Sequence, residues 1–143
     1  MRGNCKPRKN QDNDIGVSAT VPASYEIDKD RRLVITTASG VLTLAEALSH
    51  QEKLLGDKDF DPEFSQLVDL TGITELSIDA AGIRALAIRK VFSLRSRRAV
   101  LVNSELAFAF ARMFSTFREI SGEHLMEVFR NRKEALKWLS SSL

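Results

Sequence analysis

The chain has 143 residues, 43% of them hydrophobic, which suits one domain with a continuous core and leaves no room for a second full domain. Its single cysteine, Cys5, excludes an internal disulfide, so we expect a free surface thiol and a reducing, cytoplasmic location. Residues 1–24 lack the apolar core of a signal peptide, and no later segment approaches the roughly 20 apolar residues that a membrane span needs.

The net charge of +2 is unevenly distributed. Residues 23–83 contain 5 basic and 12 acidic side chains, whereas residues 84–143 contain 12 basic and 5 acidic ones, so the halves carry −7 and +7. Halves of opposite charge can attract each other within one fold, or can form acidic and basic faces that favour head-to-tail association. Because the folded part is neutral overall, we expect no non-specific binding of nucleic acid.

The polar first segment, residues 1–22, has too few apolar side chains to offset the entropy of ordering, and we predict a disordered tail. The globular domain then covers residues 23–143. It opens with strands at residues 24–28 and 33–38, indicated by apolar and polar alternation and by β-branched residues. A tight turn at residues 29–31 joins them as a hairpin.

Four helices are predicted from their N-terminal caps. Thr43 stands three residues before Glu46, a spacing that lets the hydroxyl and the carboxylate each satisfy a backbone N–H group. Gly56 provides a left-handed stop for this first helix, and Gly122 ends the third. The predicted helices are residues 43–55, 79–94 (capped by Asp79), 104–120 (Ser104) and 131–138 (Asn131).

Short apolar runs between the helices predict strands at residues 66–70, 97–102 and 123–129. Strands joined by a helix must be connected by crossovers, and right-handed crossovers give parallel pairing. The predicted fold class is therefore α/β, with a mostly parallel mixed five-stranded sheet, one antiparallel edge and about four helices in the order β-β-α-β-α-β-α-β-α.

An acidic segment between the first helix and the third strand raises the question of a metal site. It has no glycine at a sharp turn and no acidic residue at the twelfth position, both of which a calcium loop requires. We interpret it as a solvated loop and predict no metal ligands. Its carboxylates are Asp57, Asp59, Asp61 and Glu63.

No catalytic constellation is apparent in the sequence. His50 and His124 have no metal-type spacing to another histidine or cysteine, and no serine or cysteine stands in a nucleophile elbow. Neither glycine-rich phosphate-binding pattern occurs. We therefore expect a protein without catalytic residues and without a cofactor.

Two segments are candidate binding surfaces. Residues 89–98 hold five cations and Phe92, but they span a helix end and a strand start, so the charges need not share a face and a solvated surface is expected. In residues 104–120 a core stripe is predicted from helical spacing, with two phenylalanines at its margins available for a dimer surface or a small apolar pocket. The stripe is Leu106, Phe110, Met113, Phe117 and Ile120, and the candidate pocket or dimer residues are Phe60, Phe64, Phe108 and Phe114.

The block at residues 69–83 resembles STAS domains, the sulfate-transporter and anti-anti-sigma-factor family. In that family a strand ending in Asp-Leu-Ser-Gly-Val precedes Asp-Ser-Ser-Gly-Leu at the start of the second helix. Residues 69–73 (DLTGI) match the first part, and Asp79, Gly82 and Ile83 match the second. The order of elements is similar over residues 24–139, whereas the matching letters are confined to this block.

The resemblance implies a SpoIIAA-like protein-interaction domain without enzymatic activity, often switched by phosphorylation of the serine before the second glycine. That position is Ala81, which has no hydroxyl, so the switch cannot operate there. Thr71, Thr74 or Ser77 are the alternative positions for a phosphate near the helix N-terminus. The predicted partner-binding residues are Thr71, Gly72, Thr74, Ser77, Asp79, Ala81, Gly82 and Arg84.

Two functional hypotheses follow. The first is a non-enzymatic STAS-like regulatory domain that binds a protein partner and forms a homodimer, similar to the divergent SpoIIAA-like single-domain proteins of bacteria. The alternative is a small protein that binds an apolar ligand or lipid.

Overall fold

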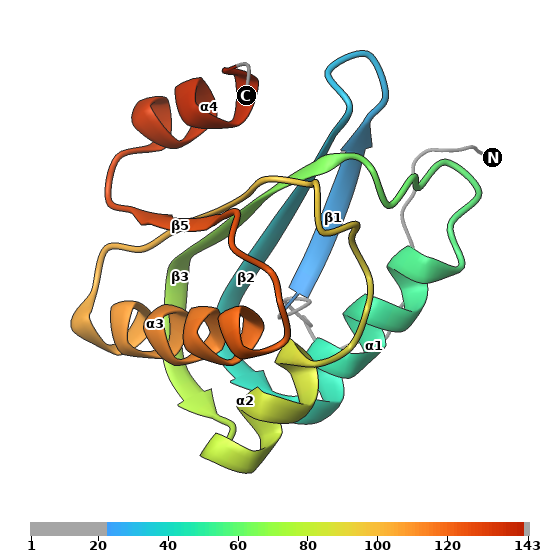
Figure 1. Cartoon of the computed structure of the whole chain (residues 1–143). Helices are drawn as coiled ribbons and strands as arrows, with labels where there is room; N and C mark the ends of the chain where they lie inside the picture. Colours follow the sequence, from blue (N-terminus) through green and yellow to red (C-terminus); the bar gives the residue numbers. More distant parts are fainter. Residues whose placement is uncertain (1–22, 142–143) are drawn as a thin grey trace, which may run out of the picture.

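The computed structural model describes residues 23–141, so the predicted tail and Cys5 lie outside the described part of the chain. It confirms the predicted α/β class (Figure 1). Five strands lie side by side in chain order, with β1 antiparallel to β2 and every other pair parallel. The strands are β1 (Ala23–Asp28), β2 (Leu33–Thr43), β3 (Ser65–Ser77), β4 (Arg98–Leu101) and β5 (Met126–Phe129).

Each helix begins at its predicted cap. The side-chain oxygen of the cap accepts a hydrogen bond from the backbone N–H group three residues later in all four helices. Gly56 has a φ of −88°, so the predicted left-handed stop is wrong there, whereas Gly122 follows the third helix with a φ of +101°. The helices are α1 (Leu44–Leu55), α2 (Ala80–Ala87), α3 (Glu105–Ile120) and α4 (Arg132–Ser140).

The helices cover the two faces of the sheet unequally. Side chains alternate between faces along each strand, so Val68 and Val100 face the core beside α3, while Leu67 and Ala99 pack with α4. Strands that follow one another in a single direction through right-handed crossovers place their connecting helices on the same face. Accordingly α1, α2 and α3 lie on one face, and α4 lies apart from them (Figure 1).

The second helix is shorter than predicted. It ends at Ala87, and residues 88–97 form an irregular segment in which Val91 is buried and Leu94 is 59% exposed. The backbone oxygens of Ala87 and Arg89 accept hydrogen bonds from the side chain of Arg118. A contact from another helix thus satisfies carbonyl groups that a longer helix would have bonded internally.

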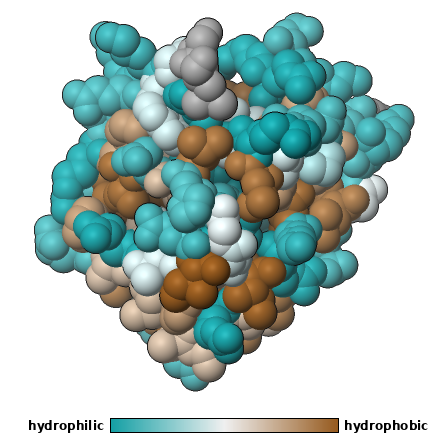
Figure 2. Space-filling model, in the orientation of Figure 1, coloured by the Kyte–Doolittle hydropathy of each residue, from teal (hydrophilic) through white to brown (hydrophobic). Residues whose placement is uncertain are grey.

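The predicted core stripe of α3 is wrong at three of its five positions, whereas Phe110 is partly buried and packs against the core. Leu106, Met113 and Ile120 are 43%, 41% and 77% exposed. The face of the molecule seen in Figure 2 carries apolar patches that polar side chains separate. The buried positions are instead Ala107 and Ala111, together with Arg118. Ala107 and Ala111 thus face the sheet together with the partly buried Phe110 and Phe114, which pack against the same core.

The third strand is longer than the predicted residues 66–70 and continues through Thr71 and Gly72 to Ser77. Residues 72–77 pair in parallel with the end of β2. The register of this pairing shifts twice, between Thr37 and Ser39 and between Gly40 and Val41. A Cβ atom at Gly72 would come within 2.9 Å of the Cβ of Ser39, so glycine permits this close pairing. As a result, β2 and β3 extend beyond the other strands as a two-stranded ribbon that leads into α1 and α2.

Within residues 23–141, we find no helix of sufficient length and apolarity to cross a bilayer.

Candidate functional site

The end of β3 and the start of α2 form an exposed rim, which we define as Thr74, Ser77, Asp79, Ala81 and Arg84. Oδ1 of Asp79 accepts the backbone N–H of Gly82 at 2.8 Å and fixes the first turn of α2. The side chains of the rim therefore stand on a capped helix and a paired strand. Each of these five of the eight predicted partner-binding residues is exposed.

Gly82 belongs to the packing beneath the rim. It is buried, and a Cβ atom at this position would lie 2.7 Å from Cγ2 of Ile78 and 3.4 Å from Cδ2 of Leu44. A methyl group would therefore collide with the neighbouring side chains. The glycine of the second matching part allows α2 to dock against the end of β3 and the start of α1.

Thr71 lies in a different environment, away from the rim. Its hydroxyl donates to Oδ1 of Asp69 at 2.6 Å, and Oδ2 of Asp69 lies 3.1 Å from Nη1 of Arg132. This chain of contacts links β3 to the start of α4. Gly72 is exposed but is pressed against Ser39, so the eight predicted residues do not form one surface.

A cavity of about 110 Å³ lies between the sheet and the layer of α1, α2 and α3. Its walls are mostly apolar and include Val68 and Leu70 from β3, Val100 from β4 and Phe114 from α3. The sequence did not predict a cavity at this place, because its walls come from elements that are distant along the chain.

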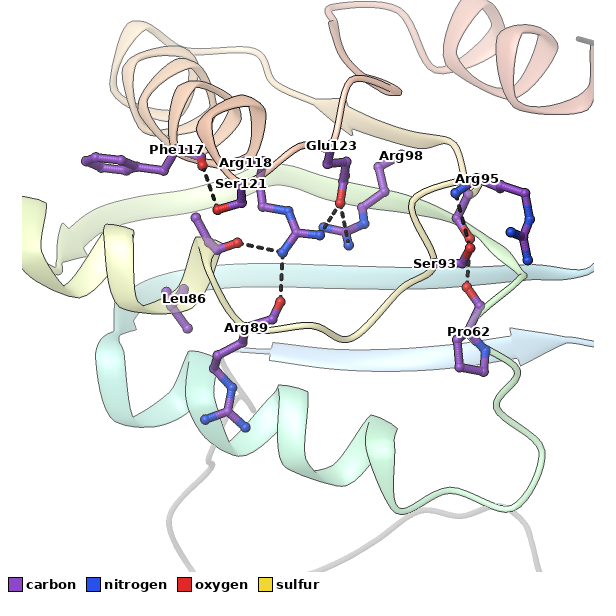
Figure 3. A network of polar contacts seen from close by, with 12 residues as sticks. Pro62, Leu86, Arg89, Ser93, Arg95, Arg98, Phe117, Arg118, Ser121 and Glu123 are labelled. Atoms are coloured by element: carbon purple, nitrogen blue, oxygen red, sulfur yellow. Dashed lines mark hydrogen bonds and ion pairs between the residues drawn. The ribbon is translucent and has the colours of Figure 1, made fainter.

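Two arginines and one carboxylate are buried together (Figure 3), and both arginines line the cavity. Arg118 donates from Nη1 to the oxygens of Ala87 (2.5 Å) and Arg89 (2.7 Å), and from Nη2 to Oε1 of Glu123. Arg98 approaches the same carboxylate oxygen from the other side, with Nη2 at 3.3 Å. Its guanidinium carbon lies 4.6 Å from the ring centroid of Phe92.

The architecture has relatives of known structure, although no protein-family model and no curated protein matches the chain. An uncharacterized protein of the DUF3478 family with a SpoIIAA-like fold, from Shewanella loihica PV-4, superimposes with a TM-score of 0.56 at 23% identity, covering 87% of this chain and 99% of that one. An anti-sigma factor antagonist from Mycobacterium paratuberculosis superimposes with a TM-score of 0.59 at 12% identity, covering 87% and 100%. This chain has a SpoIIAA-like fold. The fold is the one that the STAS resemblance predicted.

Polar side chains from β2, α1 and β3 also line the cavity of this SpoIIAA-like domain. Nε2 of Gln66 donates to Oγ1 of Thr36 at 2.9 Å, and the Thr36 hydroxyl lies 3.1 Å from Nε2 of His50. Burial, assisted by the nearby charge of Lys53, lowers the pKa of His50 to about 4. A neutral imidazole can accept the hydroxyl proton of Thr36 while the Thr36 oxygen accepts from Gln66, which accounts for both contacts.

Burial also lowers the pKa of Arg98, to about 9. The carboxylate of Glu123 opposes this shift and the charge of Arg118 adds to it. At neutral pH the guanidinium group therefore remains charged inside the domain.

The acidic segment has local and ion-pairing roles. Asp57 accepts a hydrogen bond from the Tyr25 hydroxyl at 2.8 Å, while Asp59 pairs with Lys29 and Glu63 with Arg95. Burial, followed by the hydrogen bond and charge of Asp57, raises the pKa of Tyr25. Among residues 23–141 no group of three potential metal-ligating side chains is found.

The four phenylalanines that were predicted to form a pocket or dimer surface are separated. Phe60 and Phe64 pack with Phe92 in a core cluster below α1, whereas Phe108 lies beneath the guanidinium of Arg130 at 4.9 Å. Only Phe114 of the four lines the cavity.

The arginine cluster was missed because its members are up to 25 residues apart and come from β4, α3 and the segment between α3 and β5. One local signal pointed to it. Arg98, Val100 and Val102 alternate with Ala99 and Leu101, so Arg98 occupies a position that the strand period directs into the core.

Proposed function

We propose that the chain is a regulatory protein-interaction domain without enzymatic activity, and that it binds its partner through the rim. The observation that carries this proposal is the rim itself, which presents exposed side chains on a rigid strand end and a capped helix start. The similar structure of an anti-sigma factor antagonist supports a role in protein contacts.

We further propose that phosphorylation of position 81 has no part in this regulation, because alanine has no acceptor oxygen. Thr74 and Ser77 are exposed and accessible to a kinase. A phosphate on Thr71 would meet the carboxylate of Asp69, to which its hydroxyl donates, and like charges repel at this distance.

The test first captures a partner by affinity with the unaltered chain. Binding of this partner is then measured for two variants that each reverse one positive charge. Arg84→Glu changes the rim, whereas Lys133→Glu changes an exposed position on α4, beyond the other face of the sheet. We expect the first variant to weaken partner binding at least about tenfold and the second to leave it unchanged. Equal binding by the two variants would reject the rim as the contact surface.

Self-association remains a prediction. Phe108 and Phe114 are half-buried, and a guanidinium group covers Phe108, so the homodimer surface predicted from them is not an open apolar face. Sedimentation of the full chain over a range of concentrations measures whether a dimer forms.

A second candidate function is favoured by the cavity. Tightly packed interiors contain few voids larger than a water molecule, and a cavity of about 110 Å³ exceeds that size several times. We propose that it binds a small ligand with an apolar body.

A further inference from the structure

The buried cluster beside the cavity holds two positively charged side chains and only one negatively charged side chain. Arg98 and Arg118 share one carboxylate, Glu123, and none of these side chains is more than 5% exposed. Arg118 is already matched, since it donates to Glu123 and to two backbone oxygens. Arg98 therefore contributes a positive charge for which the described chain supplies no separate anion.

Hydrogen bonding shows the same imbalance. The buried atoms without a partner in this cluster are mostly donors. A buried cation with unused donors is costly, and an anion that accepts from them offsets the desolvation. The unpartnered atoms are Nε and Nη2 of Arg98, Nε of Arg118 and Oε2 of Glu123.

The cavity walls favour a negatively charged guest. Arg89, Arg98 and Arg118 line the cavity, and among the described residues no aspartate or glutamate does. His50 also faces it and is neutral at physiological pH, because burial holds its pKa near 4. The potential inside the cavity is thus positive at the Arg98 end.

The apolar walls of the cavity determine which uncharged group the ligand can carry. Val68, Leu70, Val100 and Phe114 offer an apolar surface to a hydrocarbon group. A dry cavity of roughly 150 Å³ accommodates benzene. The volume of about 110 Å³ is smaller than this, so it limits the hydrocarbon group to at most a compact ring or a short chain and excludes a whole lipid.

We propose that this cavity binds a small amphipathic monocarboxylate, with its carboxylate on Arg98 and its hydrocarbon body between the sheet and α3. The inference rests on the ligand-binding function proposed above and names the chemical class of the ligand. A single negative charge matches the single surplus cation. A planar carboxylate can accept two parallel N–H groups of a guanidinium, which gives both affinity and orientation.

Calorimetric titration of the full chain with benzoate and hexanoate, and with the neutral benzamide and hexanamide, tests the inference. We expect one carboxylate bound per chain, and at least about tenfold weaker binding of the amides, because hydrogen bonds to charged groups are the stronger ones.

Variants identify the site. Arg98→Met is expected to weaken benzoate binding at least about tenfold. Arg95→Met removes the same charge from an exposed side chain that pairs with Glu63, and it should bind like the unaltered chain. Val68→Phe fills the cavity while retaining the arginines, so it should abolish binding even if Arg98→Met fails to fold.

The possible failures are distinguishable. Equal affinity for benzoate and benzamide would overturn the carboxylate assignment and leave the apolar cavity function standing. No binding of any of the four probes would overturn both. Unchanged binding by Arg98→Met, or displacement of benzoate by an equal concentration of phosphate, would also overturn the inference.

Discussion

His50 makes the stability of the domain depend on pH. Its pKa is about 4 in the folded chain, below the ordinary value of 6.5, because burial disfavours the charged ring. Between these pH values the unfolded chain binds a proton that the folded chain does not bind. The free energy of unfolding contributed by this residue is therefore complete above pH 6.5 and is lost as the pH falls toward 4.

We predict that the free energy of unfolding falls by about 2 to 3 kcal/mol. This value follows from the difference between the ordinary pKa of His50 and its pKa in the folded chain, reduced because the side chain is partly exposed. Urea unfolding at pH 7, 5.5 and 4.5 measures it. His50→Gln keeps an acceptor for Thr36 but does not titrate, so the difference between the two chains removes the background from carboxylates. If the free energies of unfolding of the two chains changed equally with pH, His50 would not be the titrating group.

Glu123 and Arg98 are predicted to differ sharply in their effect on stability. Glu123→Gln leaves two buried guanidinium groups without a counter-charge and should lower the free energy of unfolding by about 3 to 5 kcal/mol. Arg98→Met retains the neutral pair of Arg118 and Glu123 and should cost less than about 1 kcal/mol. Denaturant unfolding without added carboxylate compares them, and similar losses in the two variants would contradict the idea that Arg98 is the surplus charge.

At the scale of elements, the junction of β3, α1 and α2 depends on one glycine. A methyl group at Gly82 would lie 2.7 Å from Ile78, so we predict that Gly82→Ala lowers the free energy of unfolding by about 1 to 3 kcal/mol. Gly56→Ala is the matched control. Its added Cβ would meet only ordinary contacts at 3.6 Å or more, and its φ is negative, so stability should be unchanged or slightly higher. Thermal unfolding that ranks the two variants equally would argue against a packing role for Gly82.

The second helix connects the two proposed sites. Its first turn carries Asp79 and Ala81 of the rim, while Leu86 near its other end lines the cavity. Its last carbonyl group is held by Arg118, which also contacts Glu123. The eight residues of α2 thus extend from the proposed partner-binding surface to the buried arginine cluster.

At the scale of the whole molecule, the opposite charges of the two halves are partly matched inside one fold. Three ion pairs of the described chain join the acidic first half to the basic second half: Glu52 with Arg89, Glu63 with Arg95, and Asp69 with Arg132. These contacts support attraction within the fold. Each is at least partly exposed and so contributes little stability by itself, which leaves the apolar cores on both faces of the sheet as the main stabilising feature.

The sequence by itself determined the features that depend on neighbouring residues. Caps such as Thr43 and Asp79 act over three residues, and strand and helix periods are visible within one segment, so the order of elements and the SpoIIAA-like class were predictable. The proposed rim was found in the same way, from a block of contiguous residues.

Only the tertiary structure decided where elements end and which faces are buried. β3 continues past Leu70, where β2 supplies backbone partners, and α2 ends at Ala87, whose carbonyl group accepts from Arg118. α3 buries Ala107 and Ala111 and exposes Leu106 and Met113. The cavity and the arginines that line it were likewise decided only by the tertiary structure. Burial and hydrogen bonding between distant segments create the site, and no local pattern records the distance between them.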